Sequence, residues 1–279
     1  MHDAVTAEER RLFDEQGYFI RTGFLQSPRV QRICAAIDTF TAAEPPFDGR
    51  NVWRHAALAE LVVDDATLAI VDTLMGSRDY AWHHLHAARH EAGLGGVAWH
   101  HDYEQIPQTN RHHLQIHVLH YPHGLNGTIG DLVLLPGSHR SVMRRDALSF
   151  LKTQDLPGCA VIDALPPGST IFVHSALVHA RRRRPGGEGA ARYFIDDVYM
   201  HGAIKWPSYG RDGWRDTLRE MAARHSRADH PRLFDADAFF DIAEGVARLR
   251  GRSGSLALDL PAADPTIERP VAGASPIVQ

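Results

Sequence analysis

The residues with the clearest chemical potential are a histidine and an aspartate two positions apart, His100 and Asp102. Side chains two apart in a β-strand point to the same face, so a strand here would present an imidazole and a carboxylate together and turn His101 away. One more histidine would complete a facial set of two histidines and a carboxylate, which binds iron(II) and leaves positions open for a co-substrate and oxygen. The spacing therefore predicts two of three metal ligands.

The third ligand must come from another part of the chain, and the segment from Gly168 to His179 offers two candidates. His174 and His179 are five positions apart, so one unbroken strand would point them to opposite faces. We therefore expect only one of them to face the metal. Further along, Arg192 begins another strand-like run. A guanidinium at the start of a buried strand suits a fixed, bidentate contact with a carboxylate.

Histidine is abundant, with 19 residues in the chain and 11 of them between His83 and His123. Imidazole is a common metal ligand, but a count is not a site. His86 either faces the site or packs in the core, and the same alternatives apply to His117, with Gln115 pointing the same way as His117. For five others we expect surface or loop positions: His83, His84, His112, His113 and His123.

The elements that must position these residues are predicted to be mainly β with flanking helices. Short strand-like runs between turn signals fill residues 79–200, at 81–87, 114–121, 132–135, 170–173 and 193–200. This pattern favours a jelly roll over a parallel sheet. Residues 1–78 read as mostly helical, with a capping-box pair at Thr6 and Glu9 and a short strand at 18–20. Residues 201–260 read as helical again and 261–279 as a loose tail, so we expect one domain over 1–279.

Composition excludes several classes of protein. Thirty Lys and Arg residues against 34 Asp and Glu give a net charge of −4, which is not the excess of positive charge typical of a nucleic-acid binder. We find no apolar run long enough to span a membrane and no signal-peptide core, and we expect a cytoplasmic protein. Two cysteines cannot form a disulfide framework or a thiolate zinc site. We expect a monomer or homodimer acting on a small-molecule substrate.

Four blocks of the sequence, in order, resemble the phytanoyl-CoA dioxygenase-like (PhyH) family of iron(II)- and 2-oxoglutarate-dependent oxygenases. They are the opening segment Phe13–Phe19, the pair formed by His100 and Asp102, the run Gly130–Arg140 that contains Pro-Gly-Ser-His, and Gly168–His179 followed by Arg192. The pair alone is a weak signal, whereas the four blocks together are specific and extend over most of the chain.

The resemblance implies a double-stranded β-helix, a cupin-like jelly roll, in which His100, Asp102 and His179 hold Fe(II). It implies that Arg192 pairs with the distal carboxylate of 2-oxoglutarate, with Gln115 and His86 as candidate helpers. With O2 as the other co-substrate, such an enzyme hydroxylates or otherwise oxidises a C–H bond of a small organic molecule, which we expect to be a natural product or amino-acid-like. Succinate and CO2 are released.

The sequence also departs from the family pattern beside the second histidine. Some relatives place a small hydroxyl residue two positions after that histidine, where it helps to bind 2-oxoglutarate, whereas this chain has Arg181. The basic run from Arg181 to Arg184 reads either as a solvated loop or as a contact for an anionic substrate. Two other functions stay open: a non-catalytic β-helix module that binds a metal or ligand, and a cupin-type metalloenzyme that does not use 2-oxoglutarate.

Overall fold

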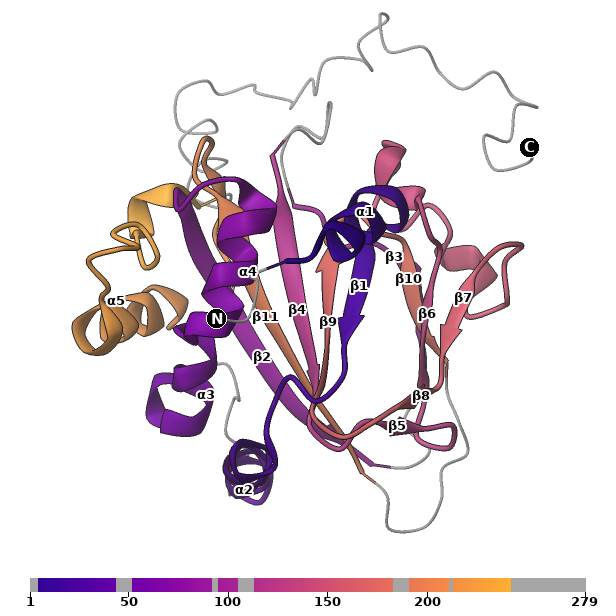
Figure 1. The fold of residues 1–279 in the computed structure, drawn as a ribbon, viewed down its shortest axis with the longest axis horizontal. Coiled ribbons are helices and arrows are strands. Elements are labelled where there is room, and N and C mark those ends of the chain that lie inside the picture. Colours follow the sequence, from indigo (N-terminus) through magenta and orange to yellow (C-terminus); the bar gives the residue numbers. More distant parts are fainter. Residues whose placement is uncertain are drawn as a thin grey trace, which may run out of the picture. The chain divides into compact units, whose positions relative to one another are not determined.

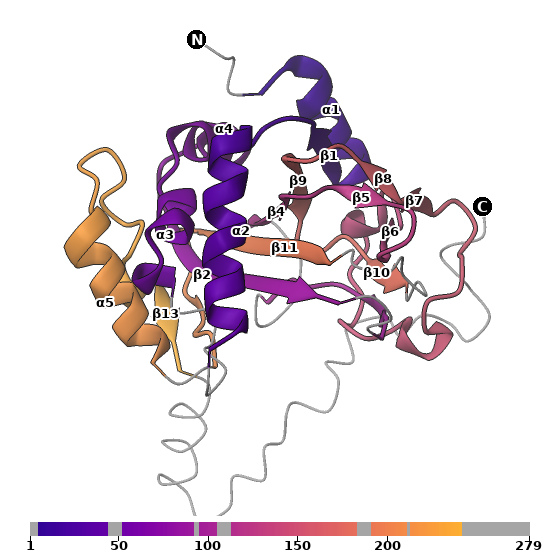
Figure 2. The ribbon, with the colours of Figure 1, turned by 90° about the horizontal axis from the view of Figure 1, so that it is seen from below.

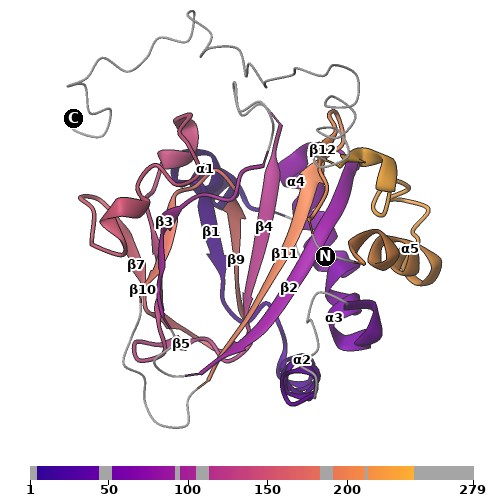
Figure 3. The ribbon, with the colours of Figure 1, turned by 180° about the vertical axis from the view of Figure 1, so that it is seen from behind.

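Two antiparallel sheets dominate the structure, a computed structural model that describes residues 5–43, 52–91, 95–104, 113–182, 191–210 and 213–241. The major sheet has five strands in the order β1–β9–β4–β11–β2, and the minor sheet has four in the order β3–β10–β6–β7. Figures 1 and 3 show the sheets facing each other. The strand bounds are β1 Tyr18–Arg21, β2 Tyr80–His90, β3 Val97–His100, β4 Gln115–Tyr121, β6 Asp131–Leu134, β7 Ala160–Ile162, β9 Ser169–His174, β10 His179–Arg182 and β11 Arg192–His201.

This sandwich confirms the predicted jelly-roll class with flanking helices. The strand-like runs read from the sequence correspond to β1, β2, β4, β6, β9 and β11, with bounds within one residue except at the end of β2, which extends three residues further, to His90. Every residue of β4 and of β9 is buried, since these strands lie in the middle of the major sheet and are covered on both faces. Double coverage explains why their sequences are largely apolar, interrupted only by Gln115, a few histidines, a serine and a threonine.

Helices cover the face of the major sheet that points away from the minor sheet. They are α2 Ser27–Thr41, α3 Ala56–Val62 and α4 Asp65–Met75, and α1 Ala7–Gln16 precedes β1 (Figures 1 and 2). The predicted capping box is confirmed, because Thr6 accepts a hydrogen bond from the Glu9 amide and Glu9 accepts one from the Thr6 amide. Helix α1 ends at Gly17, whose φ of 89° is accessible to glycine at little cost.

Among the described residues after β11, the C-terminal part contributes one helix, α5 Trp214–His225. After it, residues 226–240 form turns, the short 3-10 helix η4 Ala236–Ala238 and strand β13 Phe239–Phe240, which pairs with β12 Trp206–Pro207. The remaining short elements are η1 Val52–Arg54, β5 Leu125–Asn126, η2 Ser138–Arg140, η3 Ser149–Leu151 and β8 Ala164–Leu165. The predicted loose tail lies outside the described residues. No helix within the described ranges is long and apolar enough to cross a membrane.

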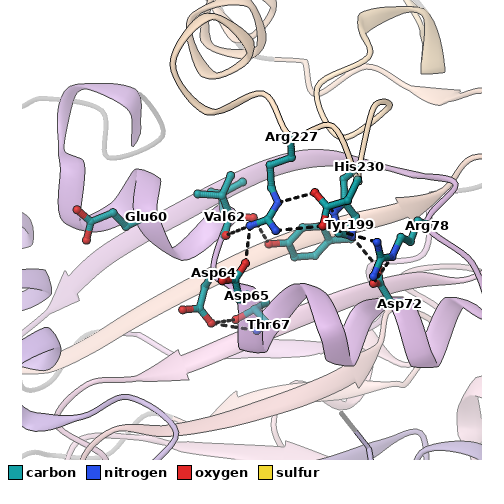
Figure 4. Close-up of polar contacts among 12 residues, drawn as sticks. Glu60, Val62, Asp64, Asp65, Thr67, Asp72, Arg78, Tyr199, Arg227 and His230 are labelled. Carbon is teal, nitrogen blue, oxygen red and sulfur yellow. Dashed lines mark hydrogen bonds and ion pairs between the residues drawn. The ribbon is translucent and has the colours of Figure 1, made fainter. Parts of the chain in front are cut away.

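A network of ion pairs ties α4 to the turn that follows α5 (Figure 4). Asp72 accepts hydrogen bonds from His230 at 2.9 Å and from Arg78 at 2.9 Å. Arg227 donates to Asp65 at 2.6 Å. Because Asp72 and His230 are largely buried, these bonds hold the C-terminal segment against the helices more firmly than exposed pairs would.

A second buried network links β11 to α3 through one hydroxyl group. Tyr199 Oη lies 2.9 Å from the carbonyl of Val62 and 2.7 Å from Asp197 Oδ2, while Trp82 Nε1 donates to Asp197 Oδ1 at 2.7 Å. Tyr199 has only one hydroxyl proton for the two acceptors. If Asp197 is protonated, it donates to the tyrosine oxygen and both contacts are satisfied. Burial raises the pKa of Asp197 to about 7, in keeping with a neutral carboxyl.

This arrangement predicts a pH-dependent stability that the Asp197→Asn substitution removes. As pH rises from about 4 to about 7, the unfolded Asp197 loses its proton first, so the free energy of unfolding of the wild type falls. An amide at position 197 donates to Tyr199 and accepts from Trp82 without titrating. We expect the variant to gain stability relative to the wild type over this interval, by up to ~1.4 kcal/mol per pH unit.

Urea unfolding at several pH values measures the difference. The exposed Asp146→Asn substitution is the control and should leave the pH profile unchanged. A constant difference between Asp197→Asn and wild type at every pH would contradict the proposed protonation.

Candidate metal centre

Pairing between β3 and β10 brings the predicted metal ligands together. His100 and His179 are direct partners in this antiparallel ladder, and their ring centroids lie 4.3 Å apart. Asp102 follows β3, and its carboxylate lies 3.6 Å from His100 Nε2 and 3.3 Å from His179 Nε2. One ligand atom from each of the three residues lies within 4.8 Å of the other two. The sequence placed these three side chains in one site, and the structure does bring them together.

Backbone carbonyls fix both imidazole rings in the orientation that a metal requires. His100 Nδ1 lies 2.7 Å from the Ala98 carbonyl, and His179 Nδ1 lies 3.0 Å from the Leu177 carbonyl. A carbonyl can only accept, so each Nδ1 carries the proton and each Nε2 keeps its lone pair. Both Nε2 atoms face the Asp102 carboxylate. This donor set of two imidazoles and one carboxylate fits iron(II), with coordination positions left for other ligands.

The electrostatics of the three residues favour a cation between them. Burial would raise the pKa of Asp102, but the hydrogen bond and charge of His179 keep it well below its usual range. Burial would lower the pKa of His179, and Asp102 outweighs this and raises it. Burial and the nearby His179 lower the pKa of His100. A carboxylate that stays ionised beside two imidazoles therefore favours a positive charge at this point, which a bound metal ion would supply.

Arg145 is a contributor that the sequence reasoning missed. Its Nη2 donates to Asp102 Oδ1 at 2.7 Å, from a segment 43 residues further along the chain. The Arg145 carbonyl also accepts the amide of His101 at 3.1 Å. Partners of this kind orient a ligating carboxylate and are part of the design of a metal site. Such a long sequence separation gives no signal in the sequence.

The three residues lie in a cavity of about 300 Å³ between the two sheets. Its middle is lined by apolar side chains, among them Leu119, Leu134, Val173 and Phe194. Arg192 lies in the same cavity and is 2% exposed, and its Nη2 donates to the Tyr121 hydroxyl at 3.2 Å. Arg192 Nε has no hydrogen-bond partner, and within the described part of the chain no carboxylate forms an ion pair with Arg192. A buried guanidinium in this state is suited to an anionic ligand.

The other predicted site residues fall in different places. His86 lines the cavity, whereas the buried Gln115 is not among the described residues that do. Gln115 instead accepts the Glu104 amide at 3.0 Å. His117 lines the cavity together with Asp196, an acceptor that we did not predict, at 2.8 Å. Burial would lower the pKa of His117, but Asp196 raises it to about 9.

Several expectations about the remaining histidines need correction. His83 and His84 are buried on β2, not at the surface, because this strand is covered by the segment that carries Tyr209 and Trp214. His113 is half-buried and His123 is exposed, while His112 lies outside the described residues. His101 points away from the site, with its Nε2 2.9 Å from the Met143 carbonyl. His174 is also buried away from the cavity and packs against His139.

Comparison with known proteins agrees with this fold. The profile of the phytanoyl-CoA dioxygenase (PhyH) family matches residues 13–183, more than half of the chain. No match is found among curated protein sequences.

Similar solved structures show the same architecture at low sequence identity. One is the non-heme α-ketoglutarate-dependent carbocyclase SnoK from nogalamycin biosynthesis, with a TM-score of 0.60, 19% identity, and coverage of 75% of this chain and 89% of SnoK. HygX from Streptomyces hygroscopicus, with nickel, 2-oxoglutarate and hygromycin B bound, has a TM-score of 0.60 and 17% identity, with coverage of 73% of this chain and 90% of HygX. EctD from S. alaskensis, with 2-oxoglutarate and 5-hydroxyectoine, has a TM-score of 0.59 and 16% identity, with coverage of 74% of this chain and 79% of EctD.

Removing a ligand residue should abolish metal binding without unfolding the protein. We expect Asp102→Ala and His179→Ala to lose stoichiometric Fe(II) or Mn(II), because each leaves only two of the three donors. Equilibrium dialysis followed by metal analysis measures the stoichiometry. His123→Ala, which removes an exposed histidine, is the matched control and should bind metal like the wild type. Full metal occupancy in both ligand variants would show that the metal binds elsewhere.

Proposed function

The chain belongs to the phytanoyl-CoA dioxygenase family of iron(II)- and 2-oxoglutarate-dependent oxygenases, and we propose that it oxidises a C–H bond of a small organic molecule. In this proposal the substrate is a natural product or is amino-acid-like, and 2-oxoglutarate is converted to succinate and CO2. The observation that carries the proposal is a single cavity that contains the His100, Asp102 and His179 cluster together with the buried guanidinium of Arg192, which forms no ion pair within the described residues.

These residues match the chemistry of 2-oxoglutarate. His100, Asp102 and His179 would hold the metal that the keto-acid end of the co-substrate chelates, and Arg192 would hold the distal carboxylate. Bound iron(II) and 2-oxoglutarate activate dioxygen, which is the hard part of the chemistry. Tyr121 positions Arg192 through its hydroxyl, and the rings of Tyr121 and Phe194 lie 5.3 and 4.9 Å from the guanidinium carbon. These contacts fix the direction in which Arg192 meets an anion.

The protein's own task is to bind, orient and exclude water. Apolar side chains, among them Leu119 and Phe194 of the major sheet and Leu134 of the minor sheet, line the cavity that contains the metal ligands. A dry wall strengthens the electrostatic contacts inside the cavity and protects reactive species from side reactions. Arg145 holds one oxygen of Asp102, so the carboxylate keeps a fixed orientation toward the two histidines.

A small-molecule substrate agrees with the size of the cavity and with the molecules bound by proteins of similar fold. About 300 Å³ is at the lower end of the range for small-molecule sites. The HygX and EctD structures contain hygromycin B and 5-hydroxyectoine. These ligands support a small organic molecule as the class of substrate for this chain.

The proposed role of Arg192 predicts a defect confined to the co-substrate. Mn(II)-loaded Arg192→Gln should bind metal normally and lose about 10- to 100-fold in affinity for 2-oxoglutarate, because a charge-assisted contact of about 1.5–3 kcal/mol is removed. Calorimetric titration measures the affinity, and succinate formation by the Fe(II) enzyme measures turnover. Arg219→Gln, an exposed substitution on α5 that removes the same charge, is the control.

Two results would contradict the proposal. Wild-type protein that binds metal but neither binds 2-oxoglutarate nor forms succinate would indicate a binding module or a metalloenzyme of another kind. Unchanged 2-oxoglutarate affinity in Arg192→Gln would place the distal carboxylate somewhere else.

A further inference from the structure

A second arginine, Arg181, lies in the same cavity as Arg192. It is two residues after His179 on β10, and β10 pairs residue for residue with β6 along this stretch. The pairing of β10 with β3 shifts register between His179 and Arg181, where three residue steps along β3 lie opposite two along β10, so the extra residue belongs to β3. Strand β10 itself keeps its alternation against β6, and His179 and Arg181 point to the same face. Ala180, between them, is fully buried on the opposite side against Trp99 and Val133. The fold thus places a guanidinium on the wall that carries a candidate metal ligand.

The contacts of Arg181 hold its side chain without neutralising its charge. Nη1 donates to His90 Nδ1 at 3.0 Å, and Nη2 donates to the Gly95 carbonyl at 2.8 Å. Burial, with the charges of Arg181 and Arg192, lowers the pKa of His90 to about 3, so its ring is neutral and accepts this hydrogen bond. In the part of the chain that the structure describes, no carboxylate forms an ion pair with Arg181.

Two guanidinium groups that share one cavity repel each other unless an anion lies between them. Burial and the proximity of Arg192 lower the pKa of Arg181, which shows that the two charges interact. Among the described residues the buried Nε of Arg192 has no partner, and Arg181 makes two side-chain hydrogen bonds although a guanidinium has five N–H groups. A carboxylate offers four lone-pair positions, enough to accept from both groups.

The distance along β10 matches the length of the co-substrate. Two residues of a strand rise by about 6.6 Å, which is comparable to the length of an extended five-carbon diacid. A 2-oxo acid bound to a metal on His179 would therefore be long enough for its distal carboxylate to reach the part of the cavity that Arg181 lines. The β11 strand supplies Arg192 from the facing sheet, so the two guanidinium groups approach that point from different walls.

We propose that Arg181 and Arg192 together bind the distal carboxylate of 2-oxoglutarate, and that Arg181 helps to select a five-carbon 2-oxo diacid as the co-substrate. This inference rests on the proposed function and adds a second binding residue to it. The first two arginines of the basic run therefore have different roles. Arg181 serves the cavity, while Arg182 forms a structural ion pair with the buried Asp131.

The test compares two ligands that differ only in the group Arg181 would bind. Mn(II)-loaded wild type and Arg181→Gln are titrated by calorimetry with 2-oxoglutarate and with 2-oxopentanoate, which has the same chain length and no distal carboxylate. We expect Arg181→Gln to weaken 2-oxoglutarate binding about 10- to 100-fold and to leave 2-oxopentanoate binding unchanged. Arg219→Gln should behave like the wild type with both ligands.

A second variant distinguishes the loss of this contact from a folding defect. Arg181→Lys keeps the charge and the aliphatic stem but loses the planar fork, so we expect a smaller loss that is again confined to 2-oxoglutarate. Both variants should keep wild-type Mn(II) stoichiometry and thermal unfolding midpoint.

The outcomes separate this inference from the proposed function. Wild-type affinity for 2-oxoglutarate in Arg181→Gln, or an equal loss for both ligands, would overturn the role of Arg181 while the proposed function stands. The first of these results would instead indicate that Arg181 contacts an anionic group of the substrate. Failure of the Mn(II)-loaded wild type to bind 2-oxoglutarate would overturn both.

Discussion

The antiparallel pairing of β3 with β10 sets His100 directly opposite His179, and the rest of the site is arranged around that pair. Two residues opposite each other in such a ladder have close Cβ atoms, so both imidazoles reach the same point without bending the backbone. The Asp102 amide donates to the Ser175 carbonyl at 2.8 Å, which ties the carboxylate to the connection leading into β10. A register slip of one residue would turn a histidine to the opposite face and remove the site.

Groups that suit a cation and groups that suit an anion line the same cavity. The Asp102 carboxylate lies beside the Nε2 atoms of two imidazoles, an arrangement that accepts a cation. Arg192 and Arg181 offer positive charge to an anion. A dianionic keto acid bound to a metal would contact both groups of residues at once. The residues of the cavity therefore suit a metal and a keto acid bound together better than they suit either ligand alone.

Strand alternation made much of this predictable from the sequence. The two-residue spacing of His100 and Asp102, the burial of Arg192 at the start of β11 and the helix cap at Thr6 all follow from local rules. Contacts between distant segments could not be read in this way. Arg145 reaches Asp102 from a loop, and Asp196 meets His117 across the β4–β11 pair. His83 and His84 look like surface residues in a polar run, but the segment after β12 covers them. Gln115 shares a strand with His117 and has a different role, because its amide group bonds to the backbone of Glu104.

A crystal structure of the protein grown with Mn(II) and 2-oxoglutarate, with anomalous data collected for the metal, would test the central claim most directly. We expect one anomalous peak bound by His100 Nε2, Asp102 and His179 Nε2. We also expect the distal carboxylate of 2-oxoglutarate to contact Arg192. A metal bound by other residues, or a 2-oxoglutarate molecule whose distal carboxylate is turned away from Arg192, would contradict the central claim.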